Sequence, residues 1–266
     1  MILKDFFFRS RRIHFKLVGE GYPILLLHGY QADSRIWEYF TPFMEGNYQL
    51  IIPDIPGHGN SPYIQAVNTM EHLAELINRL ILFLGIPYLS LAGHSMGGYI
   101  ALAMAEKNIS SFDHVFLINS HPFADSMTRA LARSREADLI EQGRKHQILI
   151  SFVRNNFYEG NHAILNDAIK FATKVAIEQP EKGMLADLTG MMARKDRLSV
   201  IEKNINKFHI ITGENDDKIP PQLFYKMKDK GMNLHLLEEC GHLSILEHPE
   251  KVAEIIKRVC REKDRI

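Results

Sequence analysis

Residues 88–98 read Tyr-Leu-Ser-Leu-Ala-Gly-His-Ser-Met-Gly-Gly, an apolar run that leads directly into a G-x-S-x-G motif. Such a motif between a buried strand and a helix is typical of a nucleophile elbow, where the glycines permit a sharp turn. The turn lifts the serine hydroxyl above the carboxyl edge of the sheet, and the N-terminus of the next helix favours negative charge there. Alone, the motif also fits a glycine-rich turn, since chance gives a match in roughly one chain in ten of this length. In its context it predicts Ser95 as a nucleophile.

Short apolar runs elsewhere predict further strands, several of them buried on both faces of a parallel sheet. These runs lie at residues 6–8, 13–18, 23–27, 50–52, 115–118, 208–211 and 234–237. Leucine and isoleucine recur at helical spacing between residues 73 and 84, with Asn68 and Glu71 as a predicted capping pair at the start. Helices are also predicted over 99–107 and 249–261. Alternating strands and helices predict the α/β class, with a mostly parallel sheet flanked by helices.

One long segment interrupts this alternation. Residues 122–206 carry helical patterns and many charges but no run typical of a buried strand. The segment is too long for an ordinary loop, and apolar residues such as Ile148, Phe152 and Phe157 favour a folded insert over a disordered one. We therefore predict an α/β core over 1–121, an inserted helical cap over 122–206, and the rest of the core over 207–266.

A second loop at the same sheet edge follows the apolar run at 23–27 and begins His28-Gly29-Tyr30. In elbow enzymes an amide from such a loop joins the amide after the nucleophile to hold an oxyanion. The expected oxyanion donors are the backbone amides of Tyr30 and Met96. His28 is interpreted as a hydrogen-bonding residue of the loop rather than as a catalytic base.

The catalytic base is sought late in the chain, because elbow enzymes run serine, acid, histidine in sequence order. Of the 13 histidines, His242 stands in Cys240-Gly241-His242, after the last predicted strand and before the C-terminal helix. His248 and His235 are weaker candidates, since one precedes a proline at a helix start and the other lies within a strand. Position therefore selects His242.

The catalytic acid is expected in the loop that follows the strand at 208–211. This loop contains three acidic residues, Glu214, Asp216 and Asp217. One acidic side chain at this place can orient the imidazole and stabilise its charged form. Asp216 and Asp217 are adjacent, so only one of them can point inward. Asp216 is preferred, with Asp217 second and Glu214 a distant third.

Taken together, these motifs resemble the α/β-hydrolase fold superfamily, in its lid-bearing serine hydrolases, over essentially the whole chain. Residues 54–61, Asp-Ile-Pro-Gly-His-Gly-Asn-Ser, resemble the family's D-x-P-G-x-G-x-S loop, which is structural there. Residues 213–220 resemble its G-x-x-D-x-x-x-P segment, which independently selects Asp216. The insert lies where such families carry a helical cap, although its own sequence matches no cap that we can name.

The resemblance implies a serine hydrolase that cleaves a small carboxylic ester or a related acyl substrate. We expect His242 to deprotonate Ser95, which attacks the carbonyl, and an acyl-enzyme to be hydrolysed in turn. Carbon–carbon bond hydrolases and a menaquinone-pathway lyase use the same triad and stay open. The lyase is less favoured, because it tends to carry arginine where this chain has Tyr99. A cofactor-free perhydrolase also stays open, whereas a haloalkane dehalogenase would need aspartate at position 95.

A different class of function is a ligand receptor built on the same fold, since some such receptors keep an intact triad. A receptor would recruit a partner when its ligand binds and would turn that ligand over very slowly, which would distinguish it from an enzyme. For the substrate pocket we expect His121 and Phe123, which follow the strand at 115–118. The cap arginines are interpreted as solvated helix faces, with carboxylate recognition as the less favoured reading.

Composition limits the remaining possibilities. Lysine plus arginine and aspartate plus glutamate number 32 each, so no net charge draws the chain to nucleic acid or anionic membranes. With two cysteines, no apparent signal peptide and no long apolar run, we expect a cytoplasmic protein outside the membrane. No dinucleotide, P-loop or zinc motif is complete, so neither a cofactor nor a metal is expected. The predicted partner is a small-molecule substrate.

Overall fold

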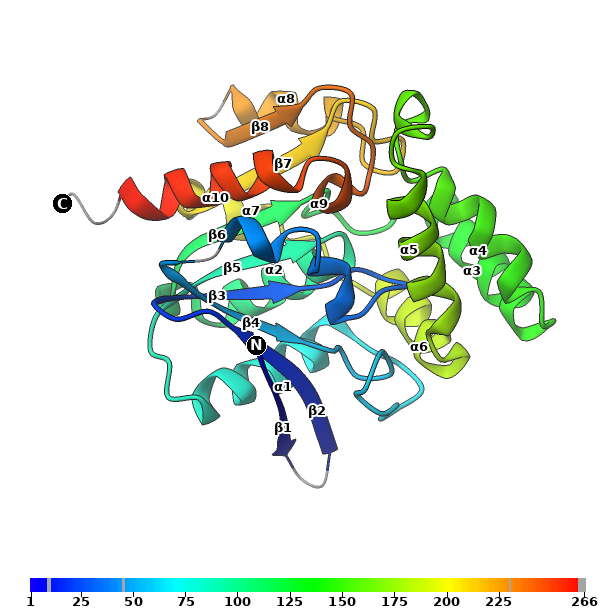
Figure 1. Ribbon diagram of the computed structural model, residues 1–266, viewed down its shortest axis with the longest axis horizontal. Coiled ribbons are helices and arrows are strands. Elements are labelled where there is room, and N and C mark those ends of the chain that lie inside the picture. Colours follow the sequence, from blue (N-terminus) through cyan, green and yellow to red (C-terminus); the bar gives the residue numbers. More distant parts are fainter. Residues whose placement is uncertain (9–10, 45, 230, 263–266) are drawn as a thin grey trace.

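Eight strands form one sheet at the centre of the computed structural model, which describes residues 1–8, 11–44, 46–229 and 231–262 (Figure 1). The strands are β1 (Ile2–Phe8), β2 (Arg11–Val18), β3 (Tyr22–Leu27), β4 (Tyr48–Pro53), β5 (Leu89–His94), β6 (Phe112–Ile118), β7 (Phe208–Gly213) and β8 (Asn233–Leu237). They lie in the order β1-β2-β4-β3-β5-β6-β7-β8. Only the pairings of β2 with β1 and with β4 are antiparallel among these described strands.

The apolar runs form strands because both faces of the sheet are covered. Every residue of β5 and of β7 is buried, as continuous hydrophobic sequence predicts for the central strands of a parallel sheet. Parallel neighbours end at the same edge, so the loops after β3, β5, β6 and β7 meet there. The predicted α/β-hydrolase fold class is confirmed.

Helices cover the two faces of the sheet. α1 (Met70–Phe83) and α2 (Met96–Asn108) pack against each other on one face, while α10 (Pro249–Glu262) packs against the other (Figure 1). Two short helices, α8 (Gln222–Lys228) and α9 (Ser244–Glu247), lie in the loops around β8. Single 3-10 turns complete the core and cap: η1 (Ser34–Trp37), η2 (Thr41–Met44), η3 (Ile109–Ser111), η4 (Glu159–Asn161) and η5 (Ile205–Lys207).

The start of α1 differs from the prediction. Its N-cap is Thr69, whose hydroxyl accepts a hydrogen bond from the His72 amide at 3.2 Å. Asn68 is instead buried, and its side-chain amide donates to the Pro56 carbonyl at 3.0 Å and to Asp187 at 2.7 Å. The predicted Asn68–Glu71 capping pair is therefore wrong, because a long-range contact with the cap occupies the Asn68 side chain.

Five further helices lie between β6 and β7: α3 (Met127–Glu141), α4 (Lys145–Arg154), α5 (Asn166–Glu178), α6 (Glu181–Met192) and α7 (Leu198–Glu202). α3 packs against α6, and α4 against α5. In Figure 1, α3 to α6 stand together beyond the end of the sheet to which the arrow of β3 points. This arrangement fits the predicted helical cap, whose boundaries at 122 and 206 stay a prediction.

Buried polar contacts attach this helical layer to the core. The Gln179 side chain donates to Asp33 at 2.8 Å and accepts from the Gly59 amide at 3.0 Å. Within the helical layer itself, the Gln179 carbonyl accepts a hydrogen bond from the Lys145 ammonium at 2.9 Å. Since buried polar groups stabilise a fold only when they are paired, these bonds hold the helical layer in one position over the strand ends.

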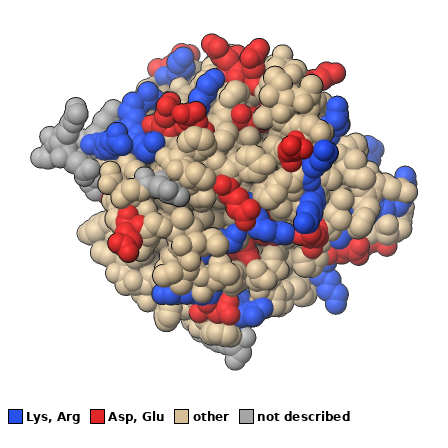
Figure 2. All heavy atoms as spheres, in the orientation of Figure 1, with Lys and Arg blue, Asp and Glu red and all other residues tan. Residues whose placement is uncertain are grey.

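No helix within the described residues is both long and apolar enough to cross a membrane. On the face shown in Figure 2, positive and negative side chains are interspersed, in keeping with the equal numbers of the two kinds in the sequence.

Candidate active site

Ser95 stands at the turn between β5 and α2 with φ of 51° and ψ of −115°. A positive φ is uncommon for a residue other than glycine, and such strain persists only where neighbours enforce it. Here the Ser95 amide donates to the Ile118 carbonyl at 2.9 Å, and the Ser120 hydroxyl donates to the Ser95 carbonyl at 2.7 Å. The elbow is therefore fixed from the adjacent strand β6.

Glycine is required on both sides of this turn. A Cβ atom at Gly97 would collide with the backbone carbonyl of Leu27, and one at Gly93 would collide with the carbonyl of Gly97. Both contacts are with backbone atoms, which cannot move aside as a flexible side chain can. The G-x-S-x-G pattern thus follows from the close approach of β3, β5 and α2.

A chain of hydrogen bonds leads from Ser95 to an acid. The Ser95 Oγ lies 2.9 Å from His242 Nε2, and His242 Nδ1 lies 2.9 Å from Asp216 Oδ2. Because an ionised carboxylate can only accept, Nδ1 carries the proton of the neutral imidazole and Nε2 is free to accept from the serine hydroxyl. The structure brings together the three residues that the sequence selected, from three separate loops.

The other histidine candidates lie elsewhere. His235 is in β8, where its ring stacks against His209 at 6.0 Å between centroids. His248 lies 3.2 Å by its Nε2 from the Glu239 carbonyl. His28 is held in its own loop, since its Nδ1 lies 2.9 Å from the Gly29 carbonyl and its Nε2 accepts from the Ile55 amide. The interpretation of His28 as a loop residue is confirmed.

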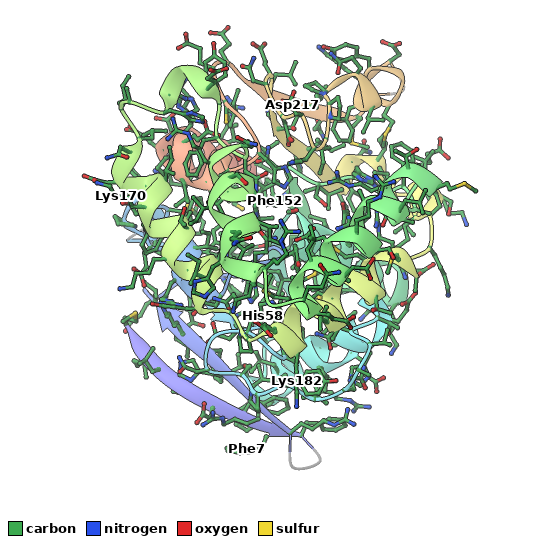
Figure 3. All side chains as sticks on the ribbon, turned by 90° about the vertical axis from the view of Figure 1, so that its right-hand side faces the viewer. Phe7, His58, Phe152, Lys170, Lys182 and Asp217 are labelled. Atoms are coloured by element: carbon green, nitrogen blue, oxygen red, sulfur yellow. The ribbon has the colours of Figure 1, made fainter. Side chains whose placement is uncertain are left out.

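Asp216 is the buried acid of its loop. Besides His242, it accepts hydrogen bonds from the amides of Lys218 and Ile219, each at 2.9 Å. Burial alone would raise the pKa of Asp216, but the His242 charge and these hydrogen bonds outweigh it and leave that pKa below its ordinary value. Asp217 is exposed, and Figure 3 shows it at the rim of the face that carries the cap helices.

Asn119 is a site residue that the sequence analysis missed. It has a φ of 45°, and its side-chain amide donates to Asp216 Oδ2 at 2.9 Å and to the Gly241 carbonyl at 3.0 Å. Its side-chain oxygen Oδ1 accepts a hydrogen bond from the Ser244 hydroxyl. The only signal in the sequence was its place, directly after the strand that ends at Ile118. Asn119 ties the loop of the acid to the loop of the histidine.

We expect Asn119→Ala to lower kcat/KM for ester substrates by about 10- to 100-fold, the range seen when a supporting hydrogen bond to a site residue is lost. Asp216 and the Gly241 loop would lose their shared partner, so the imidazole would be less well oriented. Steady-state hydrolysis of p-nitrophenyl acetate measures the effect. Asn108→Ala, at the exposed end of α2, is the matched control. Equal activity of the two variants would show that Asn119 does not position the site.

The cap also holds the histidine loop. The His242 amide donates to the Asn156 carbonyl at 2.7 Å, and Glu247 accepts from the amides of Gly241 and Tyr158 at 2.8 and 2.9 Å. On the core side, His94 Nε2 lies 2.9 Å from the His242 carbonyl. Burial, together with the nearby His242, lowers the pKa of His94 to about 3, so His94 stays neutral. None of these supporting contacts was predicted from the sequence.

Tyr30 and Met96 follow the paired strands β3 and β5, so both lie at the edge that carries Ser95. Met96 is the first residue of α2, whose N-terminal amides have no partner within the helix. Tyr30 lines the cavity beside Ser95. The placement suits two oxyanion donors, and that role of the two amides stays a prediction.

A cavity of about 50 Å³ adjoins Ser95, and cap and core side chains both line it. Its lining consists of Tyr30, His94, Ser95, Tyr99, Arg129, Arg133, Phe152, Asn156, Met191, Lys218, Ile219, His242 and Leu243. In Figure 3, Phe152 lies near the middle of the cap-bearing face. Within the described residues, no histidine, cysteine, aspartate and glutamate side chains are grouped so as to hold a metal ion.

The structure does not place His121 and Phe123 in the lining of this cavity. His121 Nε2 lies 3.3 Å from the Tyr99 hydroxyl oxygen. The His121 ring stacks on the Phe123 ring, with 5.7 Å between the two centroids. Tyr99 therefore stands between His121 and the cavity. The expected substrate-pocket role of His121 and Phe123 stays a prediction.

Comparison with known proteins places the chain in a family. The profile of the alpha/beta hydrolase family matches residues 24–255. A thermophilic esterase from Thermogutta terrifontis has the same fold, with a TM-score of 0.89, 24% identity, and coverage of 98% of this chain and 99% of the esterase.

Curated relatives differ in how much of their length is matched. A dihydrolipoyllysine-residue acetyltransferase component of the acetoin cleaving system from Pseudomonas putida is 27% identical over 90% of this chain but only 63% of its own length. A 2-succinyl-6-hydroxy-2,4-cyclohexadiene-1-carboxylate synthase from Enterobacter is 24% identical over 91% of this chain and 93% of its own length. A pimeloyl-[acyl-carrier protein] methyl ester esterase from Legionella pneumophila is 31% identical over 41% of this chain and 43% of its own length. The protein described here is an enzyme of the alpha/beta hydrolase family.

Proposed function

We propose that the protein hydrolyses small carboxylic esters, with Ser95 as nucleophile, His242 as general base and Asp216 as the acid that orients it. The observation that carries this proposal is the unbroken chain of two 2.9 Å contacts from Ser95 Oγ through His242 to Asp216. This geometry, on a strained elbow beside a cavity, suits an activated serine.

The reaction proceeds in two halves. His242 Nε2 takes the hydroxyl proton as Ser95 Oγ bonds to the ester carbonyl carbon, and the oxyanion forms opposite the amides of Tyr30 and Met96. The imidazolium then gives its proton to the leaving alcohol as the ester C–O bond breaks. Water, deprotonated by the same imidazole, attacks the acyl-enzyme and releases the acid and free Ser95. Asp216 stabilises the imidazolium in both halves.

Two further points support an ester as substrate. One relative is named as a methyl ester esterase, although this chain matches only 43% of its length. The cavity beside Ser95 is small, at about 50 Å³, which favours short acyl groups over long ones. The balanced charge and the two cysteines support a small-molecule substrate in the cytoplasm as the setting of the reaction.

Pre-steady-state hydrolysis of p-nitrophenyl acetate tests the proposal. We expect a burst of p-nitrophenol equal to the enzyme concentration, followed by slower steady release, because the acyl-enzyme accumulates when its hydrolysis is the slower half. p-Nitrophenyl decanoate should react with a lower kcat/KM, since the cavity beside Ser95 has a volume of only about 50 Å³. If neither ester is hydrolysed above the background rate, the carbon–carbon hydrolase or lyase alternative would replace this proposal.

A further inference from the structure

Three basic side chains, from Arg129, Arg133 and Lys218, line the cavity that contains Ser95. Arg129 and Arg133 stand one turn apart on α3, while Lys218 lies in the loop between β7 and α8. Cations from the cap and from the core thus face one small space. An ester carbonyl alone does not require so much positive charge.

Arg133 is occupied by the protein itself. Its Nε donates to Asp125 at 2.7 Å, and Arg194 donates to the same carboxylate at 2.6 Å. Arg194 also lies over the Tyr99 ring, 4.0 Å from its centroid. Asp125 therefore positions both arginines and offsets one of their two positive charges, so we assign Arg133 and Arg194 a structural role in the cap.

Arg129 and Lys218 have no such partner. Among the described residues, no acidic side chain pairs with the Arg129 guanidinium or with the Lys218 ammonium. The Lys218 ammonium lies over the Phe152 ring, 4.6 Å from its centroid. The nearby Glu136 carboxylate accepts instead from the Tyr30 hydroxyl at 3.0 Å and from Gln31 at 2.7 Å. Asp216, another acid of the region, is bonded to His242, and the exposed Asp217 acts on Lys218 through its charge without an ion pair.

The two unpaired cations also disfavour each other. Burial and the charge of Arg133 lower the pKa of Arg129, and burial and the charge of Arg129 lower the pKa of Lys218. Half-burying two like charges side by side costs free energy unless an anion joins them. An anionic group in the cavity would remove this cost.

We propose that Arg129 and Lys218 bind a carboxylate of the substrate, so that the preferred substrates are half-esters of short dicarboxylic acids. This inference rests on the proposed function, because it names the substrate class of the same site. Arginine binds a carboxylate with two parallel hydrogen bonds, and a neighbouring lysine adds a point charge. Because Arg129 and Lys218 line the same small cavity as Ser95, one small molecule can present its carboxylate to the cations and its ester carbonyl to Ser95.

The test compares kcat/KM for monoethyl glutarate with that for ethyl hexanoate, an uncharged ester of similar length. We expect the wild type to prefer the half-ester by about tenfold or more, and Arg129→Met or Lys218→Met to reduce this ratio at least about tenfold, as loss of a charged hydrogen bond predicts. Lys218→Arg should keep more of the ratio than Lys218→Met. Arg135→Met and Lys182→Met, both at exposed cap positions, serve as matched controls.

A binding measurement separates this inference from the proposed function. Calorimetric titration of monoethyl glutarate into the Ser95→Ala protein does not depend on turnover. Binding that Arg129→Met abolishes, without any ester hydrolysis by the wild type, would support the carboxylate site and reject the esterase. Ester hydrolysis with no preference for the half-ester, or a preference unchanged in both Met variants, would reject the carboxylate site alone.

Discussion

Replacing Ser95 with alanine is expected to lower kcat for p-nitrophenyl acetate by about 10⁴- to 10⁶-fold, since triad nucleophiles act as a unit with their base. The hydroxyl 2.9 Å from His242 Nε2 would be gone, and no acyl-enzyme could form. Alanine is smaller than serine and accepts the same backbone with little added strain. The loss of activity should therefore come from the missing nucleophile and not from unfolding of the variant.

Thermal unfolding of the variant distinguishes these two causes. We expect a melting temperature within a few degrees of the wild type, because removal of one half-buried hydroxyl leaves the packing around it almost unchanged. Ser110→Ala, at an exposed position after α2, provides the matched control for removal of a serine hydroxyl. A Ser95→Ala protein that is folded and hydrolyses the ester as fast as the Ser110→Ala protein would exclude Ser95 as nucleophile.

Asp216→Asn is expected to lower kcat by about 10⁴-fold, the cost of the corresponding change in a well-studied serine protease. The asparagine amide can donate to His242 Nδ1, which would move the imidazole proton to Nε2 and leave no acceptor for the Ser95 hydroxyl. The uncharged side chain would also no longer stabilise the imidazolium. Turnover of p-nitrophenyl acetate at neutral pH measures the loss.

Asp217→Asn is the matched control for this change, since Asp217 is adjacent and exposed. It removes the same charge from the same loop but no contact with His242. A larger loss of kcat in Asp217→Asn than in Asp216→Asn would transfer the role of the acid to Asp217 and contradict the geometry at His242.

Local sequence predicted the elbow well because the constraint there is local. The glycines around Ser95 are required by backbone contacts that any strand–turn–helix of this kind makes. The resemblance of residues 213–220 to a G-x-x-D-x-x-x-P segment favoured Asp216 over Asp217, and the position after the last predicted strand favoured His242 over His235. Parallel strands that end at one edge bring such loops together without further information.

Long-range contacts were not predictable in the same way. The Asn119 side chain holds Asp216, and the Asn156 carbonyl holds the His242 amide. No motif near Asn119 or Asn156 in the sequence indicates which loops they contact. Asn68 matched a capping pattern, yet its side chain bonds to Asp187 of the cap. In each case a partner distant in sequence decides the outcome.

Covalent labelling with a fluorophosphonate addresses the proposed nucleophile most directly, since the reagent phosphonylates a serine that a base has activated far faster than other side chains. We expect peptide mass spectrometry to find one adduct per chain, on Ser95, and labelling to slow strongly in His242→Ala. An adduct on another residue, or equal labelling of the Ser95→Ala protein, would contradict the triad.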